Sequence, residues 1–347
     1  MLKAPVERAL YPFDVARREL LLTLQHVPVL RSFPARRDLR LSLMLGAHVL
    51  LAFTVAILCP ALSLVLSPLI LGVPHVAADV RYLVLRRSLP VRWLVVVASC
   101  IAGMLAMRAF MSVTRPSTLG LYVEHALGAA WLLAAALLRP RASRLLPLMA
   151  AGILGAVALL WPREFSLALT HGHNLVALVA WLALYRWQSR AAWLAIGVVL
   201  LLGAWLATGA WVATTFDWGW PSSLGLHVFA ATDWLAPGIA EPRATGVTMS
   251  FAFLQAVHYA IWLFAIPQDS LRREASLSFR MSFRALLRDF GASGLGVVLA
   301  SLSVVAVFGA LAPLQTRNVY LSLSTFHAWL ELASLLFLTR ARGLAQR

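Results

Sequence analysis

The strongest constraint on the fold of this chain is a regular alternation of long apolar runs with arginine-rich connections. Most of the runs contain 20 or more residues. At 1.5 Å per residue this length lets a helix cross a hydrocarbon core about 30 Å thick. Breaking the sequence at proline, glycine and arginine clusters predicts ten such helices, of which the fifth is the shortest: 41–59, 62–86, 91–113, 117–138, 145–161, 165–186, 191–213, 246–266, 291–312 and 317–339.

Composition supports the same class. Hydrophobic residues make up 61% of the chain and charged residues only 13%, whereas soluble domains carry about 25% charged residues. The only two cysteines, Cys59 and Cys100, are too few for a disulfide framework and form no CxxC motif. The sequence therefore predicts an all-α polytopic membrane protein.

Arginine placement predicts the orientation. Every second connection is basic, and the opposite connections carry one arginine or none. Because cytoplasmic loops are enriched in Lys and Arg, we expect both termini in the cytoplasm and the helices in five hairpins. The expected location is a bacterial inner membrane. The basic groups are Arg31 to Arg40; Arg86, Arg87 and Arg92; Arg139, Arg141 and Arg144; Arg186 and Arg190; Arg272 to Arg288; and Arg340, Arg342 and Arg347.

The net charge of +16 is concentrated in the cytoplasmic segments of this topology. There it would meet anionic lipid head groups, so membrane lipids are the expected partners. Nucleic acid is not expected, because no module of interleaved aromatic and basic residues is present. The predicted organisation is a basic interfacial segment (1–40), a single transmembrane domain (41–340) with an outer loop (214–245) and a cytoplasmic loop (267–289), and a cytoplasmic tail (341–347).

Histidines gather on the helices that run from the outside to the inside. His26 and His48 lie near the cytoplasmic end and His227 lies in the outer loop; the remaining six are His75, His125, His171, His173, His258 and His327. Counted from the outer helix ends, His75, His258 and His327 fall within roughly 5 Å of one another along the membrane normal. Ionisable groups at this depth are functional candidates by default.

Two carboxylates accompany these histidines. Asp79 follows His75 by four residues, and Glu331 follows His327 by four, so each pair shares a helix face. We predict that Asp79 and Glu331 are catalytic carboxylates that orient the ligands by hydrogen bonds. A single intramembrane histidine can also serve only in helix packing, but two such pairs and a third histidine favour a metal site.

The predicted metal ligands are therefore His75, His258, His327 and one of His171 and His173. These last two are two residues apart and cannot face the same direction on a regular helix. A further set of residues is predicted to line a substrate pocket. This prediction is weaker, because aromatic residues at such positions usually serve packing. The residues of this set are His125, Glu124, Tyr259, Trp262, Phe326 and Trp329.

The donor set narrows the choice of metal. Imidazole and carboxylate ligands suit iron, zinc or copper(II), and Cu(I) is disfavoured because membrane Cys and Met clusters are absent. The HExxH motif of zinc hydrolases and the histidine boxes of membrane desaturases are also absent. We expect Fe(II), which would react with O2, with zinc and haem as alternatives.

The segment Gly72-Val73-Pro74-His75-Val76-Ala77-Ala78-Asp79 resembles the G-x-P-H-x-x-x-D element of the bacterial β-carotene 15,15′-dioxygenase family of the Brp/Blh type. The phenylalanine-rich stretch 250–259, which contains His258, and the stretch 326–331, which contains His327 and Glu331, are similar to later elements of that family. The family's His-Phe-Gly motif has only Thr170-His171-Gly172-His173-Asn174 as a counterpart, without the Phe and the following Asp, and its second histidine after the phenylalanine-rich stretch is missing.

This resemblance implies a membrane enzyme that holds a non-haem iron through histidines from separate helices and cleaves a carotenoid. The sequence thus favours an iron-dependent oxygenase that acts on an apolar lipid or carotenoid-like substrate. A lipid hydroxylase or desaturase would use the same iron. The alternatives from other classes are a haem-binding redox protein and a transporter with a His/Asp/Glu proton or ion relay.

Overall fold

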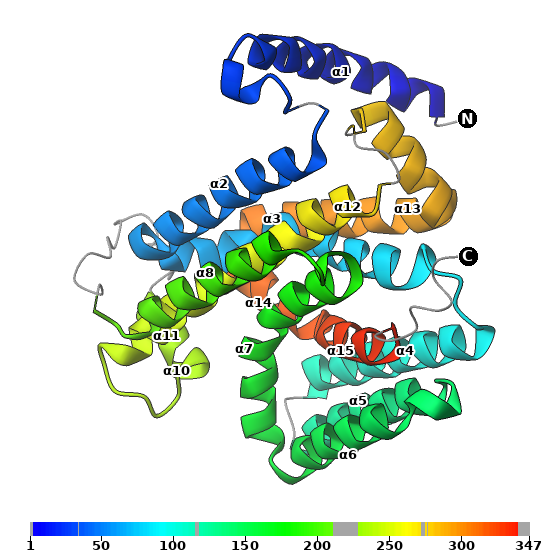
Figure 1. Cartoon of the computed structure of the whole chain (residues 1–347). Coiled ribbons are helices and arrows are strands. Elements are labelled where there is room, and N and C mark those ends of the chain that lie inside the picture. Colours follow the sequence, from blue (N-terminus) through cyan, green and yellow to red (C-terminus); the bar gives the residue numbers. More distant parts are fainter. Residues whose placement is uncertain are drawn as a thin grey trace.

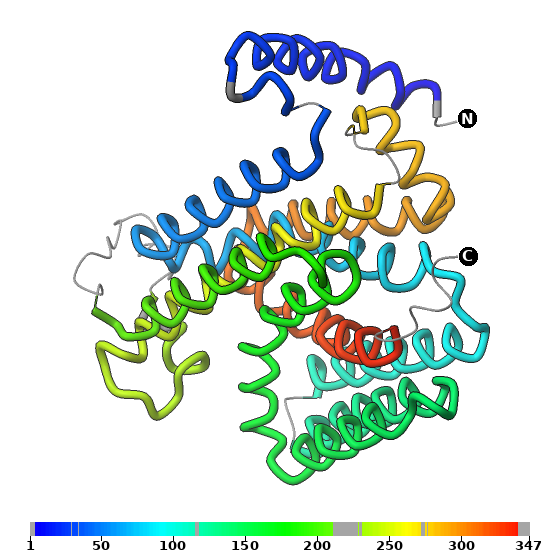
Figure 2. Tube along the Cα trace, in the orientation of Figure 1, coloured from blue at the N-terminus to red at the C-terminus, as the bar shows by residue number. Residues whose placement is uncertain are grey.

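The structure, a computed structural model, is built from helices and contains no strand in the residues that it describes, which are 3–33, 35–114, 118–210, 228–271, 275 and 277–338. Figures 1 and 2 follow the chain from its N-terminal helix to its C-terminal one. Part of the predicted outer loop (214–227, with His227) and the predicted tail (341–347) lie outside the described residues.

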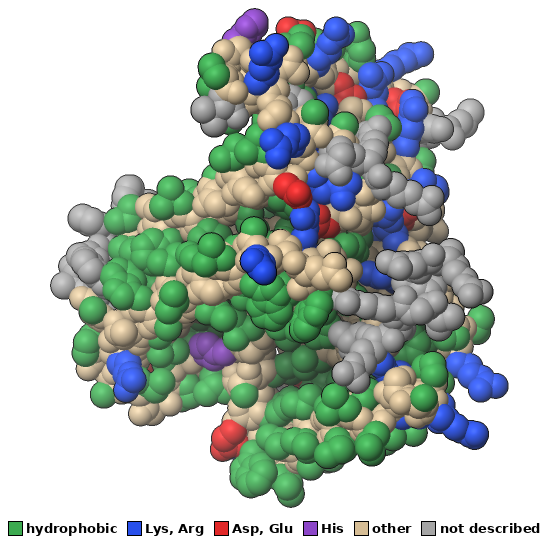
Figure 3. Space-filling model, viewed as in Figure 1, with side chains coloured by type: hydrophobic (Ala, Val, Ile, Leu, Met, Phe, Trp, Pro, Cys, Tyr) green, Lys and Arg blue, Asp and Glu red, His purple; other side chains and the backbone are tan. Residues whose placement is uncertain are grey.

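Within this described part, nine helical spans are long and apolar enough to cross a membrane: Arg37–Leu58, Pro60–Leu85, Val91–Thr114, Thr118–Leu137, Pro162–Arg186, Arg190–Ala207, Arg243–Asp269, Phe279–Leu311 and Pro313–Leu338. Large apolar side chains such as Leu50, Val113 and Leu201 are exposed on them, as expected for helices that face lipid and not water. Hydrophobic side chains cover much of the visible face in Figure 3. The chain therefore has the build of an integral membrane protein.

A tenth apolar helix, α6 (Leu145–Leu160), matches the predicted fifth segment. Its 16 residues give a length of about 24 Å at the usual helical rise, which is short for a full crossing. The other predicted segments correspond to α2 (Arg37–Leu58), α3 (Pro60–Asp79), α4 (Val91–Thr114), α5 (Thr118–Leu137), α7 (Pro162–Trp181), α8 (Arg190–Ala207), α11 (Arg243–Ala260), α13 (Phe279–Leu311) and α14 (Pro313–Leu323) with α15 (Phe326–Leu338).

Three junctions between successive helices share the same local chemistry. The helix pairs α2–α3, α6–α7 and α13–α14 are each separated by a single non-helical residue, which is Cys59, Trp161 or Ala312. Each of these residues precedes a proline. Proline disfavours the helical conformation in the residue before it but is well tolerated at the first position of a helix. The X-Pro step therefore ends one helix and starts the next without a loop.

Three of the histidine-bearing spans depart from regular α-helix toward their C-terminal ends. π-helical segments continue α3, α7 and α11: η2 (Val80–Leu85), η4 (Leu182–Arg186) and η6 (Ile261–Ala265), the last leading into α12 (Ile266–Asp269). The final predicted helix is also interrupted, because α14 ends at Leu323 and α15 begins at Phe326. Such irregular segments are tolerated at membrane depth where protein surrounds them.

The α11 span lies at the centre of the molecule. Of the residues in its apolar segment 78% are buried, whereas the figure for the α13 span is 6%. α11 packs against α2, α3, α7 and α8, and also against α10 (Val228–Leu235), a short helix from the predicted outer loop. α15 packs against α3, α5 and α7. The histidines on α3, α7, α11 and α15 are thereby brought toward one another.

The predicted cytoplasmic loop 267–289 contains more structure than expected. Residues 279–290 form a helical arm that is continuous with α13 but bends away from it at Gly291. Gly291 has φ 69° and ψ 176°, a conformation that only glycine adopts without strain. The arm packs against α1 (Lys3–Gln25), which belongs to the predicted interfacial segment and lies beside the arm in Figure 1.

Asp14 on α1 joins these two helices. Its carboxylate accepts hydrogen bonds from the Arg280 side chain at 2.8 Å and from the Phe279 amide at 2.6 Å. Burial by itself raises the pKa of this carboxyl, but the hydrogen bonds outweigh it and hold the pKa below its ordinary value.

We therefore expect the contact between α1 and the arm to weaken at low pH. The pKa of Asp14 is lower when α1 contacts the arm than when the carboxyl is free. Ionised Asp14 therefore stabilises the contact above about pH 4, the pKa of a free Asp, and this stabilisation is lost as the pH falls further. Spin labels on α1 and on the arm should report a fixed distance at pH 6 and a broadened one near pH 3. The Asp14→Asn variant should already show the broadened distribution at pH 6, and a wild-type distance that is unchanged by acid would contradict this account.

Candidate metal centre

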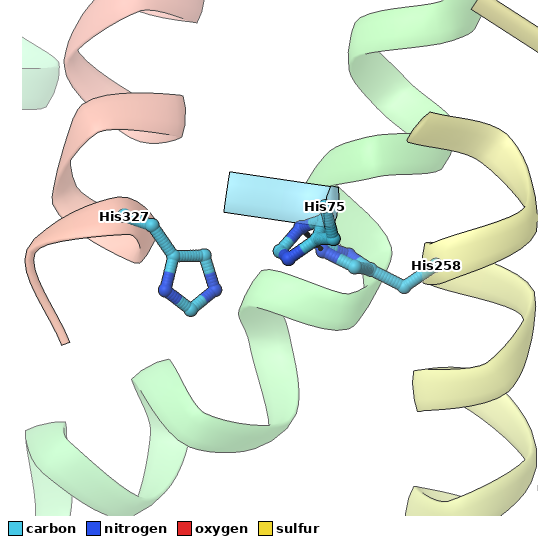
Figure 4. A group of neighbouring side chains, drawn as sticks. All are labelled: His75, His258 and His327. Carbon is cyan, nitrogen blue, oxygen red and sulfur yellow. Dashed lines mark hydrogen bonds between the residues drawn. The ribbon is translucent and has the colours of Figure 1, made fainter. Parts of the chain in front are cut away.

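Three buried histidines from three separate spans converge on one point. His75 on α3, His258 on α11 and His327 on α15 direct their rings toward one another in Figure 4. The Nε2 atoms of His75 and His258 are 2.7 Å apart. One ring nitrogen of each histidine lies within 4.8 Å of the other two. Ligand atoms bound about 2.1 Å from one ion lie about 3–4 Å apart, so small movements would let all three rings share a cation.

A fourth ring completes the group, and we call His75, His173, His258 and His327 the histidine cluster. The ring centroid of His173 on α7 lies 5.1 Å from that of His258 and 5.2 Å from that of His327. The His75 ring lies 4.6 Å from His258 and 5.0 Å from His327. Four imidazoles from four helices therefore face one small volume.

Local backbone contacts fix how two of these rings point. The Nδ1 atom of His173 lies 2.8 Å from the Thr170 carbonyl oxygen, and Nδ1 of His327 contacts the Ser324 carbonyl oxygen at the break between α14 and α15. A carbonyl can only accept, so each Nδ1 must carry the proton and donate it. This tautomer leaves the lone pair on Nε2, the arrangement seen in histidines that bind metals.

Two carboxylates lie beside the ligand nitrogens. The Oδ2 atom of Asp79 is 3.4 Å from Nε2 of His75, and Oε1 of Glu331 is 3.6 Å from the same atom and 3.4 Å from Nε2 of His258. The sequence predicted orienting carboxylates, which would contact the far Nδ1 atoms. Asp79 and Glu331 lie near the Nε2 atoms, a position that suits a direct ligand or a proton acceptor, and their orienting role stays a prediction.

The electrostatics of the centre call for a positive charge. The side chains of Asp79 and Glu331 are fully buried; the Asp79 oxygens have no hydrogen-bond partner among the described residues, and Glu331 has only the Trp262 indole N–H. Burying an ionised carboxylate without a partner is very costly. A divalent cation among the four imidazoles and two carboxylates would supply the missing partner. The residues thus fit a cation bound by nitrogen and oxygen donors.

The structure separates His171 from His173. Nε2 of His171 lies 2.8 Å from the Leu235 carbonyl oxygen at the end of α10, and its ring packs edge-on against Phe251. His171 therefore holds the α10 helix against α7 and does not face the histidine cluster. The two-residue spacing puts these rings on opposite faces of α7, as the helical period requires.

The predicted pocket residues of α5 have other partners. Both ring nitrogens of His125 are engaged, Nδ1 by the Leu121 carbonyl at 2.7 Å and Nε2 by the Ser166 hydroxyl at 3.2 Å. Glu124 forms a 2.6 Å ion pair with Arg108 of α4. These contacts join α4, α5 and α7, and neither side chain takes part in the metal-ligand groups of the described residues.

Among the predicted aromatic walls, Tyr259 lies nearest to the cluster, with its ring centroid 5.0 Å from that of His75. Trp262 and Trp329 are completely buried, and Phe326 is partly buried against the core. These aromatic rings surround the centre with apolar surface, which would exclude water from it.

Two residues that the sequence reasoning missed support the cluster from α14. The Tyr320 ring packs on the backbone of Gly72, where an added Cβ would lie 2.5 Å from it, which explains the glycine three residues before His75. Arg317 is 5% exposed; it donates to the Leu64 carbonyl and stacks on Trp234 of α10. Its position near one end of an apolar span was the available signal, since an arginine there must find protein partners.

Trp329 fits against α5 only because residue 128 is glycine. A Cβ at Gly128 would lie 2.4 Å from the Trp329 ring. We expect Gly128→Ala to destabilise the protein by about 1–3 kcal/mol, the usual result of overpacking. Thermal unfolding in detergent measures this effect. The matched control is Gly152→Ala on α6, where nothing lies within 4 Å of the added methyl group. Equal melting temperatures for both variants would show that Trp329 is not held tightly.

A cavity of about 410 Å³ lies between α2, α7, α8 and α11. Its lining is mostly apolar, with Asp38 and Arg186 among its few charged residues. Val257 and Ile261 also line it, and they flank His258 in the sequence. The cavity thus reaches the helix turn that carries one of the candidate ligands.

Comparisons of the chain with protein-family models, with curated proteins and with solved structures gave no match. The functional argument therefore depends on the chemistry of the histidine cluster and its surroundings.

Proposed function

We propose that the protein is an integral-membrane, metal-dependent oxygenase whose cation is held by His75, His173, His258 and His327, with Asp79 and Glu331 beside it. The single observation that carries the proposal is the meeting of four imidazoles and two buried carboxylates in one small volume. Ionisable groups are rarely brought together at this depth unless they serve function.

Fe(II) is the metal that we favour. The donors are nitrogen and oxygen atoms only, a set that suits iron and zinc, and a bound Fe(II) would supply the activation of O2. The remaining roles belong to the chain: the Nδ1–H groups of His173 and His327 hold those rings in place, and the two carboxylates can accept or hold a proton beside Nε2 of His75. Haem ligated by both His75 and His258 fits poorly, because a porphyrin cannot stand between two Nε2 atoms that are 2.7 Å apart.

The proposed substrate is an apolar lipid or carotenoid-like molecule that enters from the bilayer. Its support is the apolar cavity next to α11 and the aromatic side chains packed around the cluster. The G-x-P-H-x-x-x-D segment, with its resemblance to carotenoid-cleaving enzymes, favours the same substrate class. We place the protein in a bacterial inner membrane with ten passes, α6 included, and with both termini in the cytoplasm, because the basic connections alternate along the chain.

Product analysis tests this function. The chain is expressed in a bacterial host that accumulates β-carotene, with aeration and without it, and membrane extracts are separated by chromatography. We expect an oxygen-dependent loss of substrate and a cleaved or hydroxylated product. The His327→Ala variant, expressed at the same level, should leave the substrate intact. Unchanged lipids and carotenoids in the aerated wild-type culture would contradict the proposal.

Filling the apolar cavity tests the proposed access route. Gly46 on α2 lines the cavity, and no atom lies within 4 Å of a Cβ built there. We expect Gly46→Phe to lower turnover by about tenfold or more, because the ring would occupy the space needed by an apolar substrate. Bound metal should stay at the wild-type level. Gly197→Phe on α8 is the control, since that position is equally open but does not line the cavity. Equal activity of both variants would place the access route elsewhere.

A proton relay is the second candidate function, and the direct contact between Nε2 of His75 and Nε2 of His258 favours it. Imidazoles and carboxylates in a buried chain can pass protons in transporters. The two functions predict different metal contents. A relay needs no metal, so purified protein that carries none but acidifies or alkalises vesicles would support the relay.

A further inference from the structure

A second cavity, of about 500 Å³, lies between η2, α12 and the α13 arm. Among its described lining residues, four are arginine and none is acidic; the arginines are Arg81 and Arg86 on η2 and Arg284 and Arg288 on the arm. Figure 3 shows Lys and Arg gathered over the upper and right parts of the molecule, where α1 and the arm lie.

The positive charge of this cavity is only partly neutralised. A single carboxylate, Asp289, pairs with Arg81 at 2.8 Å, with Arg288 at 3.2 Å and with Arg86 at 3.6 Å. Arg284 pairs with Glu7 of α1 through two contacts of 2.8 and 2.6 Å. Four guanidinium groups thus share two carboxylates, which leaves an excess of two positive charges. Like charges so close together repel one another, and an anion would relieve that repulsion.

The lining also indicates the kind of anion. Guanidinium groups bind phosphate through paired N–H donors. Beside the arginines, the cavity is lined by apolar groups that include Leu271, Leu277 and Met281. A ligand with both a phosphate and an apolar part matches this mixture. Basic pockets at the basic end of a membrane domain bind the head groups of anionic lipids.

We propose that this cavity binds the phosphate group of an anionic phospholipid. The bound phosphate stands between η2 and the α13 arm, and it therefore links the arm to the span that carries His75. Because the arm joins α13 at the glycine bend of Gly291, its position depends on such contacts. Lipid binding restrains the arm.

The test uses the full chain in detergent with lipid vesicles. Wild-type protein is incubated with phosphatidylglycerol vesicles, with phosphatidylcholine vesicles, or with inorganic phosphate alone. Bound lipid is counted by native mass spectrometry, and hydrogen exchange is followed in residues 279–290. We expect tighter binding of phosphatidylglycerol than of phosphatidylcholine, by about tenfold or more, and slower exchange of the arm only with the former.

The variant pair sharpens this test. Arg86→Gln combined with Arg288→Gln should lower phosphatidylglycerol binding by about tenfold or more. Arg92→Gln combined with Arg141→Gln removes the same charge from exposed arginines that do not line the cavity and should keep binding near the wild-type level. Equal losses in both variants, equal binding of the two lipids, or arm protection by inorganic phosphate but not by lipid would each overturn the proposal. The exchange measurement on wild-type protein decides the question even if a variant fails to fold.

Discussion

Replacing His258 with alanine is expected to remove the bound metal and all oxygen-dependent turnover. His258 is fully buried at the centre of the molecule, and its Nε2 atom lies 2.7 Å from that of His75. Loss of a group that merely supports a ligand usually weakens metal binding about 10–100-fold, and loss of a ligand itself should cost more. Elemental analysis of the purified variant should give less than about a tenth of the wild-type metal.

His48→Ala is the control for this prediction. His48 lies on α2 with an exposed side chain, and its Nδ1 contacts only the Met44 carbonyl within its own helix. Its removal also deletes an imidazole but should leave metal content and turnover unchanged. A His258→Ala protein that folds, retains stoichiometric metal and remains active would show that the histidine cluster is not the metal site.

Neutralising the two buried carboxylates should have opposite effects on metal binding and on the stability of the metal-free protein. In the double variant Asp79→Asn with Glu331→Gln, both side chains keep their shape but lose their charge. We expect the metal affinity to fall about 10–100-fold. The metal-free variant should unfold at a higher temperature than the metal-free wild type, because uncompensated buried charge is costly.

Metal titration and thermal unfolding of the chelator-treated proteins measure these two effects. The control is Glu164→Gln, an exposed residue in the first turn of α7. This variant should keep the wild-type metal affinity and the wild-type difference in stability between metal-free and metal-bound protein. If the double variant is less stable than the metal-free wild type, the carboxylates have a stabilising partner in the metal-free protein. If its metal affinity is unchanged, they do not contact the cation.

Most of the helical build could be predicted from the sequence, because it depends on local features. Apolar runs and the prolines at 60, 162 and 313 determine where helices stop and restart, and these signals need no knowledge of neighbouring helices. The π-helical segments and the break before His327 could not be predicted. They contain no proline or glycine that would mark them in the sequence.

The candidate site could be predicted in outline. Counting residues from the helix ends placed His75, His258 and His327 at a similar depth, and the structure brings these rings together. The choice between His171 and His173 needed the position of α10, which binds the former. The contact made by Asp79 could not be predicted either. Four-residue spacing shows that Asp79 and His75 share a helix face, but it does not show which ring nitrogen of His75 the carboxylate contacts.

X-ray absorption at the metal edge of the purified protein tests the central claim most directly, because it reports which atoms surround a bound metal. The account predicts one iron for each chain, with three or four imidazole nitrogens and up to two carboxylate oxygens about 2.0–2.2 Å away. The imidazole signal should weaken in any variant of the histidine cluster that retains some metal. Protein purified from an iron-supplied culture that binds no metal, or binds it without imidazole ligands, would contradict the account.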